Sequence, residues 1–354
     1  MSEIRNPFQN PGNSADKIEL VFARENEVGT LNKEKYFLHI VLFIGTFLST
    51  IFAGVLWAGN DPFELSNFLT GLTYAILIML IISTHEFGHY IAARIHKIPV
   101  TLPFYIPFPF LFLNPFGTMG AVIRMKAHRY SRKALFDIGV SGPIAGWITS
   151  LVILIIGFLT LPPLDYIYNI HPNYSMTGIP VTGITFGSSI LYVLLEQVLV
   201  PSGKFIPPMN EMYHYPFLCA GWFGLLITSL NMMPIGQLDG GHISYTMFGR
   251  KHVYIARFFF VLLIFFGIAG VIPALALWPG INLQGISPVL DWYIKFGSLS
   301  WVLWALLIFF VIKIKHPRTI ESGDPPLGTG RMLTGYFSFV IFIVSFCPRL
   351  IYEA

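Results

Sequence analysis

Long stretches of apolar residues alternate with short polar segments along this chain. Seven of these stretches approach the roughly 20 residues that an α-helix needs to cross the apolar core of a lipid bilayer. They lie near residues 37–58, 67–93, 134–160, 216–238, 254–278, 298–314 and 333–350. The pattern predicts an all-α, polytopic membrane protein with about seven transmembrane helices. A further apolar run, at 188–200, is shorter and contains Glu196, so we expect it to lie at the surface or to pack on the other helices.

The segment from Pro99 to Met125 is apolar, but its sequence is unsuited to a spanning helix. Prolines and glycines interrupt helical hydrogen bonding throughout it. They stand at Pro99, Pro103, Pro107, Pro109, Pro115, Gly117 and Gly120. Non-helical backbone at membrane depth is tolerated only where it packs on protein or lines a wet cavity. We therefore predict a re-entrant or interfacial hairpin near residues 99–125, with a β-like stretch at 117–123. The alternative is an apolar loop on the membrane surface.

The composition agrees with a membrane protein. Hydrophobic residues make up 54% of the chain and charged residues 11%, whereas charged residues account for about a quarter of a soluble domain. Cys219 and Cys347 both fall within apolar runs, so we expect neither a disulfide framework nor a cysteine metal site. The predicted surroundings are the lipid bilayer, and the net charge of +4 gives no indication of nucleic-acid binding.

The distribution of basic residues predicts the orientation. The loop after the second predicted helix holds Arg94, Lys97, Arg124, Lys126, Arg129, Arg132 and Lys133. The long connection at 161–215 holds Lys204 as its only Lys or Arg. Because loops rich in Lys and Arg stay in the cytoplasm, we expect a multi-pass protein of the cell membrane with a cytoplasmic N-terminus and an external connection at 161–215.

A metal-binding sequence lies inside the second predicted membrane helix, where charged groups are normally excluded. Residues 85–89 have the sequence His-Glu-Phe-Gly-His. Because residues i and i+4 share one face of a helix, His85 and His89 can bind the same Zn²⁺ ion, with Glu86 beside the open position of the metal. The spacing predicts a hydrolytic zinc site in which Glu86 moves protons.

Asp239 is the predicted third zinc ligand. It follows the fourth predicted helix, after Pro234 and Gly236, and would place a carboxylate at membrane depth. An unpaired carboxylate is costly in such surroundings, and a divalent cation relieves that cost. The alternative is that Asp239 only caps a helix that begins at Gly240. The histidines outside the two motifs, among them His39, His171, His214 and His252, are expected to be interfacial or loop residues.

Together these sequences resemble the site-2 protease family of intramembrane zinc metalloproteases, peptidase family M50. The resemblance rests on the sequence at 85–89, on Asn-x-x-Pro-x-x-x-Leu-Asp-Gly-Gly-His at 231–242, and on Ser-Gly-Pro-Ile-Ala-Gly at 141–146. It implies that His85, His89 and Asp239 hold one Zn²⁺ ion per chain. It also implies that Glu86 is the catalytic acid and base and that Asn231 assists beside the metal. The glycines of 141–146 are interpreted as helix-packing residues.

The resemblance implies regulated intramembrane proteolysis, with transmembrane proteins as substrates. Zinc lowers the pKa of a coordinated water toward about 7, Glu86 accepts a proton from that water, and the Asn231 amide can stabilise the oxyanion. The connection at 161–215 is too short for the PDZ domain of many relatives, and nothing after Arg331 has the length of a CBS pair. We expect a cytoplasmic segment at 1–36, a protease core at 37–248 and additional membrane helices at 249–354.

Three other interpretations remain open at this stage. One is a different membrane metallohydrolase that uses the same helix motif, although the Leu-Asp-Gly-Gly sequence at 238–241 argues against it. The second is a transporter in which the same four polar side chains form an ion path. The third is an inactive zinc-bound scaffold, which the presence of Glu86 disfavours.

Overall fold

The computed structural model describes residues 14–108, 116–125, 129–275, 287–320 and 323–353. Its main helices are α1 (Ser14–Trp57), α2 (Leu72–Ile95), α3 (Arg132–Leu159), α6 (Ile190–Leu199), α7 (Pro216–Asn231), α8 (Asp239–Phe248), α9 (His252–Leu275), α11 (Ser300–Leu307) and α12 (Thr329–Ser345). Short helical elements are η1 (Leu65–Gly71), α4 (Asp165–Ile170), α5 (Tyr174–Thr177), η2 (Met212–His214), η3 (Gly249–Lys251), α10 (Pro288–Ile294) and the π-helical η4 (Ile308–Ile312). The strands are β1 (Phe104–Pro107), β2 (Thr118–Val122), β3 (Ile184–Phe186) and β4 (Ile351–Glu353).

The protein is mostly helical, and within the described residues four helical stretches are long and apolar enough to cross a membrane. They are Tyr36–Trp57, Leu65–Ile95, Arg132–Leu159 and Asp239–Pro273. The other three predicted spans form the shorter helices Pro216–Asn231, Ser300–Ile312 and Thr329–Ser345. The predicted count of seven is therefore not confirmed. The run at 216–238 falls short because α7 ends at Asn231 and the chain turns through Pro234 and Gly236, whose φ is +54°.

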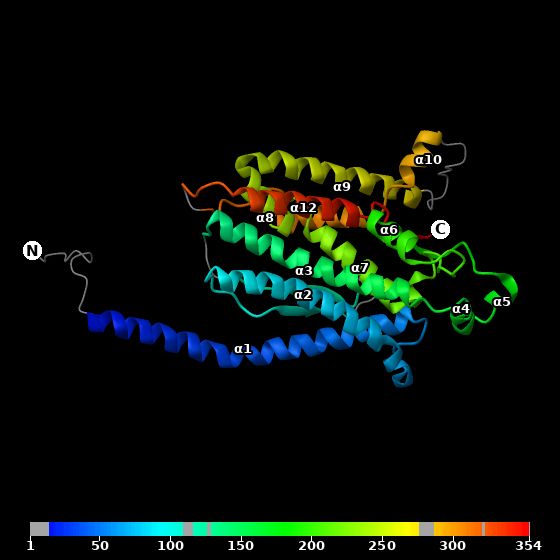
Figure 1. The fold of residues 1–354 in the computed structure, drawn as a ribbon, viewed down its shortest axis with the longest axis horizontal. Helices are drawn as coiled ribbons and strands as arrows, with labels where there is room; N and C mark the ends of the chain where they lie inside the picture. The colour runs from blue at the N-terminus through cyan, green and yellow to red at the C-terminus, as the bar shows by residue number, and fades with distance from the viewer. Residues whose placement is uncertain (1–13, 109–115, 126–128, 276–286, 321–322, 354) are drawn as a thin grey trace, which may run out of the picture.

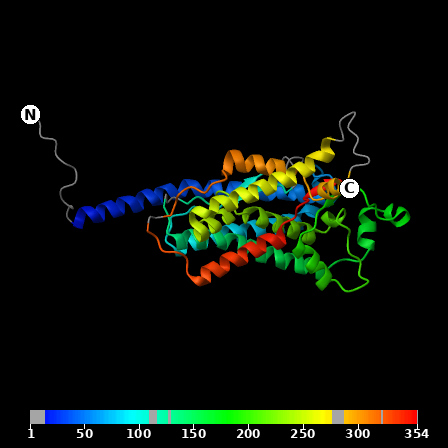
Figure 2. The ribbon, with the colours of Figure 1, turned by 90° about the horizontal axis from the view of Figure 1, so that it is seen from above.

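Helices α2, α3 and α7 lie side by side at the centre of the molecule, with α1 next to α2 and with α9 and α12 on the opposite flank (Figure 1). The first turns of α1 extend beyond the other helices (Figure 2). Aromatic side chains such as Tyr74 and Phe223 fill the interior of this bundle. Helices α2 and α3 approach very closely at Gly88, where a Cβ atom would lie 2.6 Å from the carbonyl oxygen of Ser141. The two helices therefore cross where α2 carries His85 and His89 and where α3 carries small residues such as Gly142.

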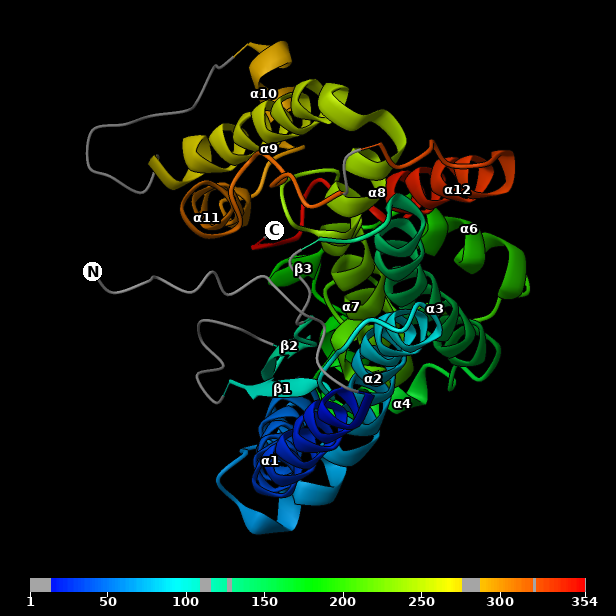
Figure 3. The same ribbon diagram turned by 90° about the vertical axis from the view of Figure 1, so that its left-hand side faces the viewer.

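The segment near 99–125 contains an antiparallel hairpin, as the prolines and glycines predicted. Strand β1 pairs with β2 in a register that sets Tyr105 opposite Ala121, while residues 109–115 lie outside the described part. The hairpin is held on the helices: the Nδ1 atom of His39 lies 2.8 Å from the carbonyl oxygen of Pro103, and Tyr105 shares a 2.8 Å hydrogen bond with Ser83. Figure 3 shows β1 beside α1, with β2 next to it.

A second small sheet joins distant parts of the chain. Strand β3, in the connection between α3 and α7, pairs antiparallel with β4 at the C-terminal end, with Phe186 opposite Ile351. Helix α6 follows β3 and packs against α3 and α12, and the side chain of its residue Tyr192 is buried. The short apolar run at 188–200 thus lies against the helical bundle.

Candidate metal centre

Three metal-binding side chains meet at the interface of α2, α3 and α8. The Nε2 atoms of His85 and His89 lie 3.1 Å apart, and each lies 3.3 Å from Oδ2 of Asp239. The two histidines come from successive turns of α2, while Asp239 is the first residue of α8. The structure therefore brings together the residue pair of the first motif and the carboxylate of the second, which are separated by about 150 positions in the sequence.

The spacing of these atoms fits one zinc ion. Ligands at about 2.0–2.1 Å from a tetrahedral metal stand about 3.3–3.4 Å from one another, close to the 3.1 to 3.3 Å found here. His85 and His89 are buried and the Asp239 side chain is 16% exposed. Two neutral imidazoles and one carboxylate form a three-ligand set that leaves a fourth position for water or substrate.

A backbone carbonyl orients one of the histidines. Nδ1 of His89 lies 2.7 Å from the carbonyl oxygen of Ile138 in α3, so Nδ1–H donates and Nε2 keeps its lone pair for a metal. The Nδ1 atom of His85 is buried and has no hydrogen-bond partner among the described residues. The contact with Ile138 could not be predicted from the sequence, because every residue has a backbone carbonyl and its side chain does not indicate which one accepts a hydrogen bond.

Glycines of α3 make room for both imidazole rings. A Cβ atom at Gly142 would lie 2.2 Å from Nε2 of His89, and one at Gly146 would lie 3.1 Å from Cβ of His85. The sequence analysis interpreted these glycines as helix-packing residues. They do lie at the helix contact, but what they pack against is the pair of candidate ligands, so α3 forms one wall of the metal centre.

The loop after α7 aims Asp239 at the histidines. Leu238 is the N-cap of α8 and Asp239 is the first helical residue, so the carboxylate is not the cap of a helix that begins at Gly240. Close contact fixes the start of α8: a Cβ atom at Gly240 would lie 1.9 Å from the carbonyl oxygen of Met232. Only glycine fits there, so steric contact with the loop explains why a glycine follows Asp239.

Glu86 and Asn231 stand beside the three candidate ligands, at a cavity of about 240 Å³. His85 and strand β2 contribute to the same cavity wall. The Nδ2 atom of Asn231 lies 3.4 Å from Nε2 of His85, and Glu86 is buried. All five residues selected from the sequence therefore gather in one place, and a cavity lies beside three of them, His85, Glu86 and Asn231.

His242, which completes the second motif, does not join the three ligands. Its Nδ1 atom lies 2.7 Å from Nε2 of His316, and the ring of His316 stacks on Tyr245. His242 thus ties α8 to the segment that precedes α12.

Comparison with known proteins identifies a family and several relatives. The model of peptidase family M50 matches residues 73–272, which is more than half of the chain and includes all five selected residues. Among curated proteins, the chain is similar to the probable zinc metalloprotease EGY2, chloroplastic, of Oryza sativa subsp. indica. The two are 29% identical over 241 residues, which are 68% of this chain and 36% of the rice protein.

Two Arabidopsis thaliana proteins are also similar. The probable zinc metalloprotease EGY2, chloroplastic, is 31% identical over 181 residues, 51% of this chain and 29% of that protein. The probable zinc metalloprotease EGY1, chloroplastic, is 29% identical over 180 residues, 51% of this chain and 30% of that protein. The chain spans about a third of the length of the curated relatives it matches.

Proposed function

Because the chain belongs to peptidase family M50, we propose that it is an intramembrane zinc metalloprotease, which hydrolyses peptide bonds within or near transmembrane segments of other membrane proteins. The observation that carries this proposal is the convergence of His85, His89 and Asp239 on one point inside a bundle of apolar helices. The same residues would hold a single catalytic Zn²⁺ ion.

Each polar residue has a role in this reaction. Zinc, when bound, supplies a Lewis acid that polarises the scissile carbonyl and makes a water easier to deprotonate. Glu86 accepts a proton from the attacking water and transfers it to the leaving amine, so that the peptide C–N bond breaks and a carboxylic acid and an amine are released. The Asn231 amide, beside His85 Nε2, donates a hydrogen bond to the developing oxyanion. Ile138 holds the ring of His89 in place.

Strand β2 would hold the substrate in an extended form. A transmembrane helix hides its carbonyl groups in hydrogen bonds between residues i and i−4, so a segment must unfold locally before it can be cleaved. Residues of β2 line the cavity that also contains Glu86, and a Cβ atom at Gly120 would meet no other atom within 4 Å. There is therefore open space beside β2 at Gly120 for a second chain. The N–H of Gly120 itself donates a 3.0 Å hydrogen bond to Oγ1 of Thr118, so addition of a peptide to the strand would use the backbone groups of neighbouring residues.

The proposal includes the arrangement in the membrane. Residues 37–248 form the protease core, residues 249–354 add membrane helices, and the shorter apolar helices complete about seven spans. The protein lies in the cell (cytoplasmic) membrane, the N-terminal segment, 1–36, and the basic loop at Arg129 face the cytoplasm, and the connection at 161–215 is external. The positive-inside rule supports this orientation.

Cleavage by the purified protein tests the function. The chain, reconstituted in lipid vesicles with a single-span membrane protein whose helix contains glycine or proline, should yield two fragments with new termini inside the membrane segment, identified by mass spectrometry. The Glu86→Gln variant should yield none. A transporter would instead move ions across the vesicle wall without producing fragments, and an inactive scaffold would do neither.

A further inference from the structure

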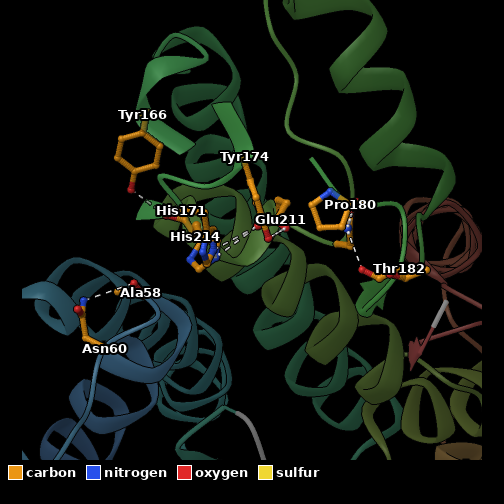
Figure 4. A network of polar contacts seen from close by, with 10 residues as sticks. Ala58, Asn60, Tyr166, His171, Tyr174, Pro180, Thr182, Glu211 and His214 are labelled. Atoms are coloured by element: carbon orange, nitrogen blue, oxygen red, sulfur yellow. Dashed lines mark hydrogen bonds and ion pairs between the residues drawn. The ribbon is translucent and has the colours of Figure 1, made fainter. Parts of the chain in front are cut away.

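A second group of metal-binding side chains lies at the opposite end of the helical bundle from the C-terminal end of α2 (Figure 1). It consists of His171, the residue after α4, together with Glu211 and His214 at η2. Figure 4 shows the three side chains pointing toward one another, with Tyr174 beside them. The sequence analysis treated both histidines as loop residues, so no role was assigned to this group.

The donor atoms converge as they do at the catalytic centre. Nε2 of His171 lies 2.9 Å from Nε2 of His214. Oε2 of Glu211 lies 3.4 Å from Nε2 of His214 and 3.8 Å from Nε2 of His171. These distances bracket the spacing of about 3.3–3.4 Å between ligands of a tetrahedral zinc ion, so small side-chain movements would place all three donors around one ion.

The local backbone explains this convergence. In a 3₁₀ segment, residues i and i+3 lie directly above one another, which sets Glu211 and His214 on the same side of η2. His171 reaches them from the end of α4. The turn that follows α1 covers the His214 ring, because a Cβ atom at Gly59 would lie 3.2 Å from its Cε1.

One of the two carboxylate oxygens of the buried Glu211 has no hydrogen-bond donor among the described residues. Glu211 is 2% exposed and its Oε2 atom makes no hydrogen bond to the described residues. Lys204 is the only Lys or Arg in the connection at 161–215. A buried carboxylate needs a counter-charge, and neutral imidazoles are the form that binds metals.

Two tyrosines support the group from outside. The hydroxyl of Tyr174 donates a 2.9 Å hydrogen bond to Oε1 of Glu211, which leaves Oε2 directed at the histidines. The hydroxyl of Tyr166 donates a 2.9 Å hydrogen bond to the carbonyl oxygen of His214. Hydrogen bonds to ligands from such surrounding groups are typical of metal sites and fix the orientation of the ligands.

We propose that His171, Glu211 and His214 bind a second divalent metal ion of the zinc class, separate from the catalytic centre. Two imidazoles and a carboxylate suit Zn²⁺, and the partly exposed face of His171 leaves a fourth position for water. The ion joins α4 to η2, and α7 begins at Pro216, two residues after His214. The ion would therefore cross-link two parts of the connection between α3 and α7, next to the N-terminal end of α7. The proposal does not depend on proteolytic activity.

Metal stoichiometry tests this site on the full-length protein in detergent. Inductively coupled plasma mass spectrometry after dialysis against micromolar zinc should find two zinc ions per wild-type chain and one in His171→Ala. Glu211→Gln keeps an oxygen that can accept the hydrogen bond of Tyr174 but removes the negatively charged metal ligand, so this variant should also retain one ion. His39→Ala, which changes a histidine that belongs to neither group of donors, is the matched control and should retain two.

A second set of variants isolates the new site. The double variant His85→Ala/Asp239→Ala lacks the catalytic ligands and should still bind one ion, which His171→Ala then removes. Cobalt added to this double variant should give the visible absorption of a site with nitrogen and oxygen ligands, and Tyr174→Phe should weaken cobalt binding by about 10-fold.

The contrary results are equally clear. One ion in the wild type and none in the double variant would mean that His171, Glu211 and His214 contact only one another and bind no metal, and the second site would be rejected. Zinc that persists in the double variant after His171→Ala would lie elsewhere and would also overturn the assignment. If the wild type bound one ion and the double variant His85→Ala/Asp239→Ala still bound it, the second site would stand, and the result would count against the proposed catalytic zinc site and protease.

Discussion

The imidazole of His89 lies directly against Gly142 of the neighbouring helix, so closely that a methyl group at position 142 would overlap Nε2 of His89. The contact makes the geometry of the metal centre depend on a residue that carries no functional group. Nδ1 of the same ring is fixed by the carbonyl oxygen of Ile138. The ring is thus held by α3 at two of its atoms, and its Nε2 atom lies 3.3 Å from Oδ2 of Asp239.

We expect Gly142→Ala to weaken zinc binding at the catalytic centre and to abolish cleavage, because the added methyl group displaces the His89 ring. Gly146→Ala should have a smaller effect, since its Cβ atom would stand 3.1 Å from Cβ of His85. Zinc titration with a chelator as competitor measures both. Ile148→Ala, a change at an exposed position of the same helix, is the control. Equal zinc affinity in Gly142→Ala and the control would show that the ring has another position available.

Asn231→Ala should lower the rate of cleavage by about 10² while the zinc content stays unchanged, because the amide lies beside the ligand His85 but is not one of the three converging donors. The kinetic comparison is kcat in reconstituted vesicles, with zinc measured on the same samples. Asn231→Asp is a useful companion, since a carboxylate keeps the size of the side chain but cannot donate a hydrogen bond. If Asn231→Ala lost zinc along with activity, its role would be in metal binding.

Cross-linking should show the substrate beside β2. Met119 is 54% exposed and lines the cavity next to Glu86, so Met119→Cys in the Glu86→Gln background should form disulfides with cysteines near the cleavage site of a substrate helix. The native cysteines are both buried, and the chain without Met119→Cys serves as control. Cross-links at positions scattered evenly along the substrate, or none at all, would contradict the proposed role of β2.

The orientation has its own test. Arg129→Cys and Met176→Cys each add one exposed thiol, on the basic loop and on α5 respectively, whereas the two native cysteines are buried. In intact cells a membrane-impermeant maleimide should label Met176→Cys and should label Arg129→Cys only after lysis. The reverse pattern would place the N-terminus outside.

The residues of the candidate metal centre could be selected from the sequence because their signals are local. A spacing of four residues puts His85 and His89 on one face of any helix, and a carboxylate among glycines at membrane depth demands a partner, so Asp239 was identifiable before its position in space was known. The hairpin was predictable in the same way, since prolines and glycines exclude a helix.

Other features depend on contacts between distant segments. The length of α7 could not be deduced from an apolar run that continues past Asn231 into the loop with Pro234. The contact between Gly142 and His89 depends on how closely two helices cross. His171 and His214 stand 43 positions apart, and nothing in their local sequences indicates that α4 brings them together.

The most direct test of the proposed chemistry compares zinc content and cleavage in the same preparations of Glu86→Gln and Asp239→Ala. Glu86 moves protons and does not belong to the three converging donors, so Glu86→Gln should retain as much zinc as the wild type while cleavage falls by about 10³-fold. Asp239→Ala should contain one zinc ion fewer and show no cleavage. Wild-type cleavage by Glu86→Gln, or full zinc content and activity in Asp239→Ala, would contradict the account.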